Sequence, residues 1–389
     1  MLVTNGEERA ALAACRALHD HGYAVDAVAG RRLAATHWSR ACERRLFAVD
    51  ARSDRSAFAD ALAELLSERD YAVLLPGSDA ALLAISEFRD RLEPRVRIGL
   101  PEHDAVMRCL TKGPLLKASR AAGIPAPNTE VCDSADEATR AARRFGFPVL
   151  IKPWASVNPD HGGLTQLATS LVPDESGLLG VVANCGTPVL VQRRVPSPVF
   201  SLAGVVAEGE LLAAMFSRYA RTWPAEAGSV SFSETMPVPP GLKRAGEAML
   251  AKLGWQGMFE IELMRGEDGS YAAIDLNPRP YGSLELAARA GVPLAAIWCD
   301  WLLGRPLRAE EPRSGLSYRW EDAEARNLWC RVRSGRIGEA AAILRPRRHT
   351  AHAHFRLRDP APLLARVLAG IRFGYSHSTR NAPGDGSAS

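Results

Sequence analysis

The stretch FEIELMRGEDGSYAAIDLNPRP, residues 259–280, alternates apolar and polar side chains over two short segments. A period of two residues is typical of β-strands that bury one face. Between the segments, an Asp-Gly dipeptide predicts a two-residue hairpin loop, because both residue types tolerate positive φ. Closing the hairpin there gives a polar face, with Glu262 opposite Asp275 and Glu260 opposite Asn277. The other face would carry the apolar residues Phe259, Ile261, Leu263, Ile274 and Leu276.

The polar face of this hairpin brings two carboxylates together, because Glu262 would lie directly opposite Asp275. Like charges in that arrangement destabilise a sheet by up to about 1 kcal/mol when they are exposed. The pattern therefore predicts that something positive lies on this face.

The length and composition of the chain indicate an ordinary globular protein with several domains. A chain of 389 residues is too long for one typical domain, so we expect two or three. Its 47% hydrophobic and 24% charged residues are typical of soluble proteins. The formal net charge of +4 is small for this length and gives no indication of a nucleic-acid partner.

Several other classes of protein are disfavoured by the sequence. The seven cysteines show no CxxC pair or metal-binding spacing, and the histidines form no HExxH cluster. No run of residues reaches the roughly 20 apolar positions that a membrane span needs. Without a recognisable signal peptide, we expect a cytoplasmic protein with reduced thiols.

The order of predicted elements divides the chain. Residues 1–103 alternate strands and helices, which predicts a mainly parallel α/β sheet. Such sheets bind ligands beyond the carboxyl ends of their strands, so Asn5-Gly6 and Gly77–Asp79 are candidate ligand loops, although ordinary turn chemistry would also explain them. Residues 104–310 read as an α+β module, 311–380 as a small C-terminal appendix and 381–389 as a disordered tail.

Four segments in this order resemble the ATP-grasp superfamily, and its carboxylate–amine ligase branch most closely. They are TKGPLLKASRAAGIPAP, FGFPVLIKP, PVLVQRRVPS and GMFEIEL followed by DGSYAAIDLNPRPYGSLELAARAG. The resemblance covers residues 1–310 approximately. It implies an ATP-grasp fold with an N-terminal Rossmann-like pre-ATP-grasp domain, a small lobe at about 125–195 and a large lobe at about 196–310.

The resemblance gives the acidic hairpin a role. In such enzymes the hairpin binds Mg²⁺ that bridges the phosphates of ATP, and Glu262, Asp275 and Asn277 match the ligand positions. Two ions are expected, with Mn²⁺ as an alternative, and oxygen ligands suit these hard cations. Family members more often have Glu at the position of Asp275, whose shorter side chain is still a competent ligand. Arg279 matches an arginine that contacts the transferring phosphate, and its planar donor fork suits phosphate oxygens.

The resemblance also implies nucleotide contacts outside the hairpin. Lys152 matches a strand lysine that reaches the ATP phosphates, and Lys112 matches a basic residue before the first helix of the module. A lysine at the end of a buried strand is hard to explain without an anionic partner. Gln192, Arg193 and Val195 match the hinge whose backbone reads adenine. No acid follows in residues 193–207, where many members place a ribose ligand, so the ribose contact is unassigned.

Two further segments match less specific parts of the family pattern. Arg218 and Arg221 lie in a basic segment that helps to hold phosphate or the substrate carboxylate, with a solvated strand end as the alternative. Residues 154–163 lie where the family has a flexible loop over the phosphates, with a plain surface loop as the alternative.

The implied activity is ATP-dependent formation of an amide or peptide bond through an acyl-phosphate, with release of ADP and phosphate. The substrates would be a small-molecule carboxylate, such as an amino acid or small metabolite acid, and an amine, and dimerisation common in such ligases makes a homodimer a further expectation. No nucleic acid or membrane would be a partner. The alternatives are a bicarbonate-activating carboxylase or carbamoyl-type enzyme and a nucleotide-binding subunit without catalysis.

Overall fold

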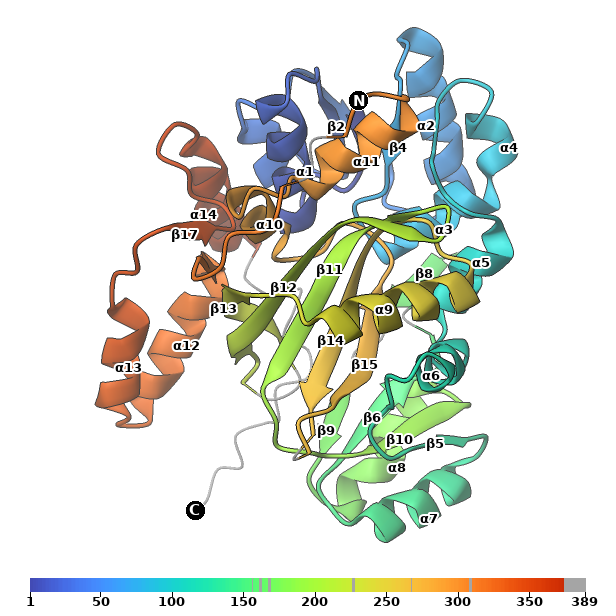
Figure 1. The fold of residues 1–389 in the computed structure, drawn as a ribbon, viewed down its shortest axis with the longest axis vertical. Helices are drawn as coiled ribbons and strands as arrows, with labels where there is room; N and C mark the ends of the chain where they lie inside the picture. The colour runs from blue at the N-terminus through green and yellow to red at the C-terminus, as the bar shows by residue number, and fades with distance from the viewer. Residues whose placement is uncertain are drawn as a thin grey trace.

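The computed structural model describes residues 1–373, except 156, 161–162, 167–168, 226–227, 267 and 308–309. The tail predicted at 381–389 and part of the predicted loop at 154–163 lie outside the described residues. Figure 1 shows the N-terminal unit at the top, a large sheet in the centre, a small lobe below it and the C-terminal helices on the left.

The N-terminal unit is the parallel α/β sheet expected from the alternation of elements. Its strands lie in the order β3-β2-β1-β4, and all neighbouring pairs are parallel. Because parallel strands share one carboxyl edge, the loops after β1 and β4 lie beside each other. The strands are β1 (Leu2–Val3), β2 (Asp26–Ala29), β3 (Arg45–Phe47) and β4 (Leu74–Leu75). The helices are α1 (Arg9–Asp20), the 3₁₀ helix η1 (Ala35–Trp38), α2 (Arg55–Glu68), α3 (Asp79–Glu87) and α4 (Arg89–Leu92).

The small lobe is an antiparallel sheet with the order β5-β10-β6-β9, covered by two helices. Its core is built from alanines of α7 and aliphatic residues of α8, β6 and β10. The strands are β5 (Thr129–Cys132), β6 (Val149–Pro153), β9 (Ser170–Val172) and β10 (Val189–Arg193), and a separate pair is formed by β7 (Val157–Asp160) and β8 (Gly163–Gln166). The helices are α7 (Ala135–Phe145) and α8 (Glu175–Cys185), and α5 (His103–Leu110) and α6 (Lys112–Ala121) precede the lobe.

The large sheet has seven strands in the order β15-β14-β11-β12-β13-β16-β17. Helix α9 packs on one face, while α11 packs on the other and also contacts α1 of the N-terminal unit. The strands are β11 (Val199–Ala207), β12 (Glu210–Trp223), β13 (Ser229–Met236), β14 (Gly257–Arg265), β15 (Tyr271–Asn277), β16 (Ser317–Arg319) and β17 (Thr350–His352). The helices around it are α9 (Pro240–Leu253), α10 (Leu284–Arg289) and α11 (Leu294–Leu302).

The C-terminal segment is built into the rest of the molecule. Strand β16 pairs with β13 and so extends the large sheet, and β17 adds the last strand. Buried Arg16 on α1 forms an ion pair with Asp359, with 2.9 Å between Nη2 and Oδ2. The helices of this segment are α12 (Glu321–Arg333), α13 (Ile337–Leu344) and α14 (Ala361–Phe373). The segment predicted as an appendix therefore contributes strands to the large sheet and contacts the N-terminal unit.

The register of the β14–β15 hairpin confirms the predicted pairing of the acids but not the predicted loop. Glu262 lies opposite Asp275, and Glu260 lies opposite Asn277. The register then shifts, because Leu263 pairs with Ala273 and Ile274 is an extra residue on β15. The expected two-residue loop is therefore wrong.

The longer tip extends over residues 266–270, where the Gly266 amide donates to the Ser270 carbonyl at 2.8 Å. The bulge also changes which side chain joins the apolar face, since Ala273 is buried there in place of Ile274.

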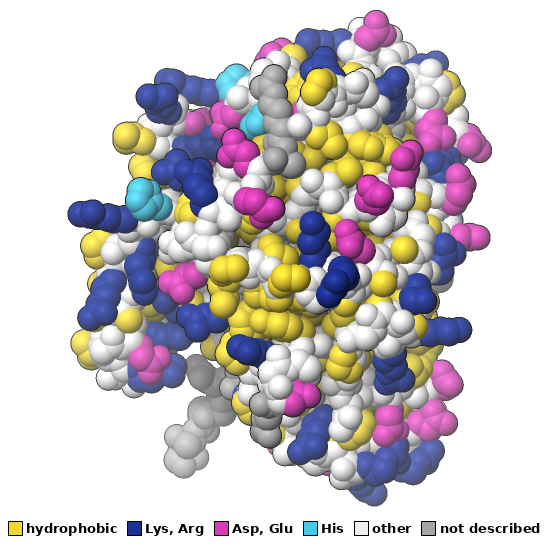
Figure 2. Space-filling view, viewed as in Figure 1, with side chains coloured by type: hydrophobic (Ala, Val, Ile, Leu, Met, Phe, Trp, Pro, Cys, Tyr) yellow, Lys and Arg dark blue, Asp and Glu magenta, His cyan; other side chains and the backbone are white. Residues whose placement is uncertain are grey.

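Two further observations concern the surface. On the face shown in Figure 2, the side chains of Lys and Arg are interspersed with those of Asp and Glu over most of the surface. Within the described part of the chain, no helix combines the length and the apolar character needed to cross a membrane.

Candidate active site

The centre of the candidate site is the polar face of the β14–β15 hairpin. It carries the carboxylates of Glu260, Glu262 and Asp275 and the amide of Asn277. Ser201 on the neighbouring strand β11 lies opposite Glu262, so its side chain shares this face. The Ser201 hydroxyl donates to Glu260 Oε1 at 2.8 Å, and Asn277 Nδ2 donates to Glu260 Oε2 at 3.1 Å. Glu260 is therefore held by neutral donors.

Tyr219 on β12 joins the two glutamates, although the sequence patterns did not single it out. Its hydroxyl lies 2.9 Å from Glu260 Oε1 and 3.2 Å from Glu262 Oε1. A tyrosine has one hydrogen to donate, so both contacts are satisfied only when one carboxylate carries a proton. The pKa of Glu262 is raised to about 8, first by burial and then by the charges of Glu260 and Asp275. This face thus carries more carboxylate groups than the surrounding groups of the protein neutralise.

Lys152 reaches this face from the small lobe. It lies on β6, it is buried, and its Nζ donates to the carbonyl oxygen of Ile274 at 2.9 Å. That carbonyl belongs to the bulged residue, which stands outside the regular strand pairing. Burial lowers the pKa of Lys152 to about 8, against the raising effect of Asp275. Lys152 therefore lies within the same electrostatic cluster as Glu262 and Asp275.

Lys112 approaches from a third element, the start of α6. Its Nζ forms an ion pair with Asp275 Oδ1, and its backbone amide donates to the Trp154 carbonyl at 2.8 Å. Burial acts to raise the pKa of Asp275, but Lys112 and Lys152 outweigh it and hold the pKa below its usual value. Asp275 is thus the ionised member of this acid pair, and Glu262 is the member that retains its proton more readily.

Arg279 lies just after β15 and contacts the N-terminal unit. Its Nε and Nη2 donate to the two oxygens of Asp79 at 2.7 and 2.9 Å. Nη2 also lies 3.3 Å from Asn277 Oδ1, and Nη1 donates to the Pro280 carbonyl at 2.9 Å. The guanidinium is consequently fixed between the hairpin and the carboxyl edge of the N-terminal sheet, where Gly77–Asp79 was expected to form a ligand loop.

The predicted hinge residues lie in and just after the strand that ends the small lobe. Gln192 is buried, and its Nε2 donates to Thr129 Oγ1 at 2.8 Å. The backbone amide of Arg193 donates to the Asn128 carbonyl at 2.9 Å, while its side chain is exposed. Val195 is half-buried in the link between β10 and β11. The segment connects the two sheets, and its contact with adenine stays a prediction.

The structure does not bring Arg218 and Arg221 together with the acidic face. Arg218 lies opposite Phe200 on the other face of the sheet, and it pairs with Glu234 at 3.3 Å. Arg221 lies beyond a bulge in β12, where its guanidinium forms an ion pair with Glu324 of α12. Both arginines therefore have partners in the large sheet and the C-terminal segment, and neither belongs to the site that we describe.

The donor set suits a divalent cation that also binds phosphate. Among the described residues, no three His, Cys, Asp or Glu side chains are grouped so as to hold a metal ion. Glu262, Asp275 and the Asn277 oxygen provide two carboxylates and one amide, and Mg²⁺ is commonly held by one or two carboxylates plus substrate phosphates. The raised pKa of Glu262 fits this set, because a cation there would favour the ionised carboxylate.

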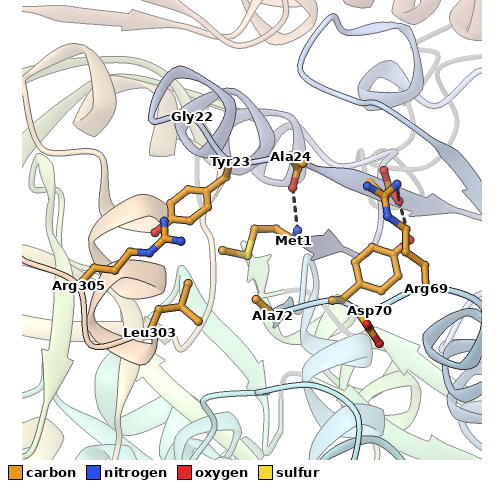
Figure 3. Close-up of a pocket in the computed structure, with 11 residues that line it drawn as sticks. Met1, Gly22, Tyr23, Ala24, Arg69, Asp70, Ala72, Leu303 and Arg305 are labelled. Carbon is orange, nitrogen blue, oxygen red and sulfur yellow. Dashed lines mark hydrogen bonds and ion pairs between the residues drawn. The ribbon is translucent and has the colours of Figure 1, made fainter.

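A cavity elsewhere in the molecule is a poor candidate for the substrate site. Its volume is about 320 Å³, and its lining includes Met1, Tyr23, Arg69 and Arg305 (Figure 3). It lies beside the starts of β1 and β2, and ligands of such sheets bind at the opposite, carboxyl edge. None of the residues described above in the candidate site lines this cavity.

Comparison with curated proteins gives partial matches. No family model matches the chain. The chain is 28% identical over 203 residues to the carbamoyl phosphate synthase large chain of Methanothrix thermoacetophila, covering 48% of this chain and 18% of that protein. It is 22% identical over 197 residues to the arginine-specific carbamoyl phosphate synthase large chain of Bacillus subtilis, covering 49% and 18%. The matches thus span less than a fifth of these relatives.

Solved structures match over most of the chain. An N5-carboxyaminoimidazole synthetase from Staphylococcus aureus has a TM-score of 0.60 at 11% identity, covering 80% of this chain and 79% of that one. The biotin carboxylase domain of Hydrogenobacter thermophilus 2-oxoglutarate carboxylase, crystallised with MgADP and bicarbonate, has a TM-score of 0.61 at 16% identity and coverages of 81% and 73%. An L-amino acid ligase from Bacillus licheniformis has a TM-score of 0.57 at 13% identity and coverages of 77% and 73%.

These relatives and structures are all ATP-grasp proteins. The order of the sheets, the paired acids of the hairpin and the structural matches therefore agree with the resemblance found in the sequence. This chain has the ATP-grasp fold, and its sequence is similar to that of ATP-grasp proteins.

Proposed function

We propose that this chain is an ATP-dependent ligase that activates a carboxylate as an acyl-phosphate and joins it to an amine. One observation carries the proposal. Glu262, Asp275 and Asn277 share one face with Lys152 and Lys112, and Arg279 stands at the edge of that face. This arrangement combines acids that suit a cation with basic groups that suit phosphates. The homodimer expected from the resemblance stays a prediction.

The proposed reaction has two steps. An oxygen of the substrate carboxylate attacks the γ-phosphorus of ATP, and the bond from that phosphorus to the bridging oxygen of ADP breaks. The nitrogen of the amine then attacks the acyl carbon, the bond to the phosphate oxygen breaks, and the nitrogen gives its proton to the departing phosphate. The products are an amide, ADP and phosphate.

Each residue of the site has a role in this scheme. Lys152 and Lys112 offset the charge of the nucleotide phosphates, and Arg279 offsets the charge that develops on the transferring phosphoryl group. Glu262, Asp275 and Asn277 would hold Mg²⁺, which supplies charge neutralisation to the phosphates when it is bound. The resting ion pair between Lys112 and Asp275 would have to open or be shared when the cation binds.

The role of Arg279 provides the direct test. We expect Arg279→Ala to lower kcat for ADP release by about 10²-fold or more, because a donor aimed at developing charge is lost. The measurement is phosphate and ADP release with a panel of carboxylate and amine pairs. Arg265→Ala, at the exposed end of the same hairpin, is the matched control and should retain activity. Turnover by Arg279→Ala within a few-fold of the unmutated protein would remove the assigned role.

A second function is favoured by the identities of the relatives. The curated relatives are carbamoyl phosphate synthase large chains, and one of the similar structures is named with bicarbonate. In that case the carboxylate would be bicarbonate and the first product carboxyphosphate. Consumption of ATP that depends on bicarbonate, with no other acid present, would select this function over the amide ligase.

A further inference from the structure

We propose that Asp79 of the N-terminal unit is a positioning residue for Arg279. Asp79 would set the orientation in which the guanidinium meets the transferring phosphoryl group, without touching the substrate itself. The inference rests on the proposed function and adds to it a residue from outside the predicted module of residues 104–310. The sequence places Asp79 in a candidate ligand loop but assigns no role to its side chain.

The contacts between the two side chains are extensive. Arg279 donates to both oxygens of Asp79 at 2.7 and 2.9 Å, which is the paired geometry that fixes a guanidinium in its plane. The Asp79 side chain is 7% exposed and that of Arg279 is 16% exposed. With the contacts to Asn277 and Pro280, four of the five N–H groups of Arg279 are engaged. The remaining one, on Nη1, is free to meet a ligand without breaking any of these bonds.

The loop that carries Asp79 is itself held firmly. Asp79 is the first residue of α3, and the Ser78 hydroxyl accepts from the Ala81 amide at 3.1 Å. The Gly77 amide donates to Thr4 Oγ1 at 3.0 Å, and a Cβ at Gly77 would lie 2.2 Å from the Thr4 carbonyl oxygen. Only glycine permits so close an approach of two backbones. Asp79 thus has a rigid position relative to β1.

The effect of Asp79 extends through Arg279 to the acidic face. Arg279 Nη2 lies 3.3 Å from Asn277 Oδ1, and the other end of the same amide donates to Glu260. These two bonds together decide which way the amide points, and they direct its oxygen toward Arg279. Loss of Asp79 would therefore loosen both the arginine and an oxygen that we assign to the cation.

A kinetic double-mutant cycle tests the proposal. We expect Asp79→Asn to lower kcat by about 10–100-fold with the KM for ATP changed by less than about 3-fold, as is typical when a supporting partner of a site residue is lost. If Asp79 acts through Arg279, the double variant Asp79→Asn with Arg279→Lys should be no slower than Arg279→Lys alone, within about 3-fold.

The control is Asp54→Ala, which removes a helix-capping aspartate in the same unit. Asp54 accepts from the Ala57 amide at 2.9 Å and caps α2, a helix that carries none of the site residues named above. The kcat of the Asp54→Ala variant should equal that of the unmutated protein. Should Asp79→Asn not fold by its thermal melting curve, Asp79→Glu keeps the charge but displaces it, and a loss of kcat with a normal melting curve is expected.

Three results would overturn the inference while leaving the proposed function in place. They are a kcat for Asp79→Asn within about 3-fold of the unmutated protein, losses that multiply in the double variant, and an equal loss in Asp54→Ala. If the unmutated protein shows no ATP consumption that depends on an added carboxylate or bicarbonate, the proposed function itself fails, and the inference fails with it.

Discussion

The pKa values of Glu262 and Lys152 are both shifted, and burial is the shared reason. Burial is the largest cause of both shifts, and it raises the pKa of Glu262 and lowers that of Lys152, each to about 8. A cation with phosphates would favour the charged form of both groups, so it would lower the first pKa and raise the second. Nucleotide binding at this site should therefore be linked to protons.

The sign of this linkage changes with pH. Below pH 8 Glu262 is mostly protonated, so binding of MgADP should release protons. Above pH 8 Lys152 is mostly neutral, so binding should take up protons. Affinity should be highest near pH 8 and weaken on both sides. Titration calorimetry at pH 7 and pH 9, in buffers with different heats of ionisation, measures the proton count, and the same sign at both pH values would contradict this account.

Tyr219→Phe extends the same prediction to a single hydrogen bond. The bond from Tyr219 lowers the pKa of Glu262, so its removal should move the acidic limb of the affinity profile to higher pH. MgADP binding at pH 7 should then weaken by a few-fold, in line with a bond of about 1 kcal/mol. Tyr271→Phe is the matched control, since its ring packs against Phe200 and Phe216 on the other face.

The sequence identified the hairpin acids and Arg279 but not the residues that support them. Alternation over residues 259–263 placed Glu260 and Glu262 on one face, which is a local property of the strand. Tyr219 and Asp79 act over separations of 43 and 200 residues, and no local pattern encodes such contacts. For Asp79 one signal existed, because Gly77–Asp79 follows a strand of a parallel sheet. For Tyr219 the indication in the sequence was weaker, because the role predicted for this segment was assigned to Arg218 and Arg221.

At the scale of elements, the close approach of β11 and β12 depends on Gly204. A Cβ at this position would lie 2.3 Å from the Ala213 carbonyl oxygen and 3.1 Å from the ring of Phe259. The backbone oxygen cannot move away without disturbing the pairing of the two strands. Gly204 is therefore required by the packing of the sheet that carries the site.

We expect Gly204→Ala to destabilise the protein by about 1–3 kcal/mol, the usual range for overpacking a core. A lower urea midpoint in equilibrium unfolding would show this. Gly241→Ala is the control, because a Cβ there meets nothing within 4 Å and the residue lies in helix α9. That change should be neutral or stabilising by up to about 1 kcal/mol. Equal effects of the two substitutions would show that packing at Gly204 is unimportant.

The elements were predictable in type, whereas the irregularity in β15 was not. The bulge at Ile274 reverses the alternation, so Ala273 is buried and Ile274 is not. Both residues are apolar, and either would suit the buried face, so the sequence carries no sign of the shift. The two-residue loop followed from assuming regular pairing.

At the scale of the whole molecule, the ion pair of Arg16 and Asp359 joins residues 343 positions apart. Asp359 also accepts from the Ser39 hydroxyl at 2.6 Å and from the Arg40 amide at 3.0 Å. The pair therefore ties α1 and the segment after η1 to the last part of the chain. The sequence predicted a small C-terminal appendix at residues 311–380, but long-range pairing of this kind has no local signature.

Asp359→Asn should destabilise the molecule by about 3–5 kcal/mol, because the charge of buried Arg16 would be left without its partner. A fall in the melting temperature at pH 7 measures the effect. Asp60→Asn, at the exposed pair with Arg91, is the control and should leave the melting temperature nearly unchanged.

The effect of Asp359→Asn should also depend on pH. Burial acts to raise the pKa of Asp359, but its hydrogen bonds and Arg16 hold it below the usual value. Its contribution is therefore full above the unfolded pKa of about 4 and is lost as pH falls through the folded value. The two proteins should become more alike in stability at strongly acidic pH, and a constant difference would contradict this assignment.

The bulge at Ile274 separates the hairpin tip from the acids in a way that has practical value. One unpaired residue stands between the Glu262–Asp275 pair and the strand ends near Tyr271, so a shift of register at the tip can be absorbed before it reaches the carboxylates. The hairpin tip is therefore a suitable place to insert a peptide. A short reporter peptide inserted there should leave the pairing of Glu262 with Asp275 unchanged.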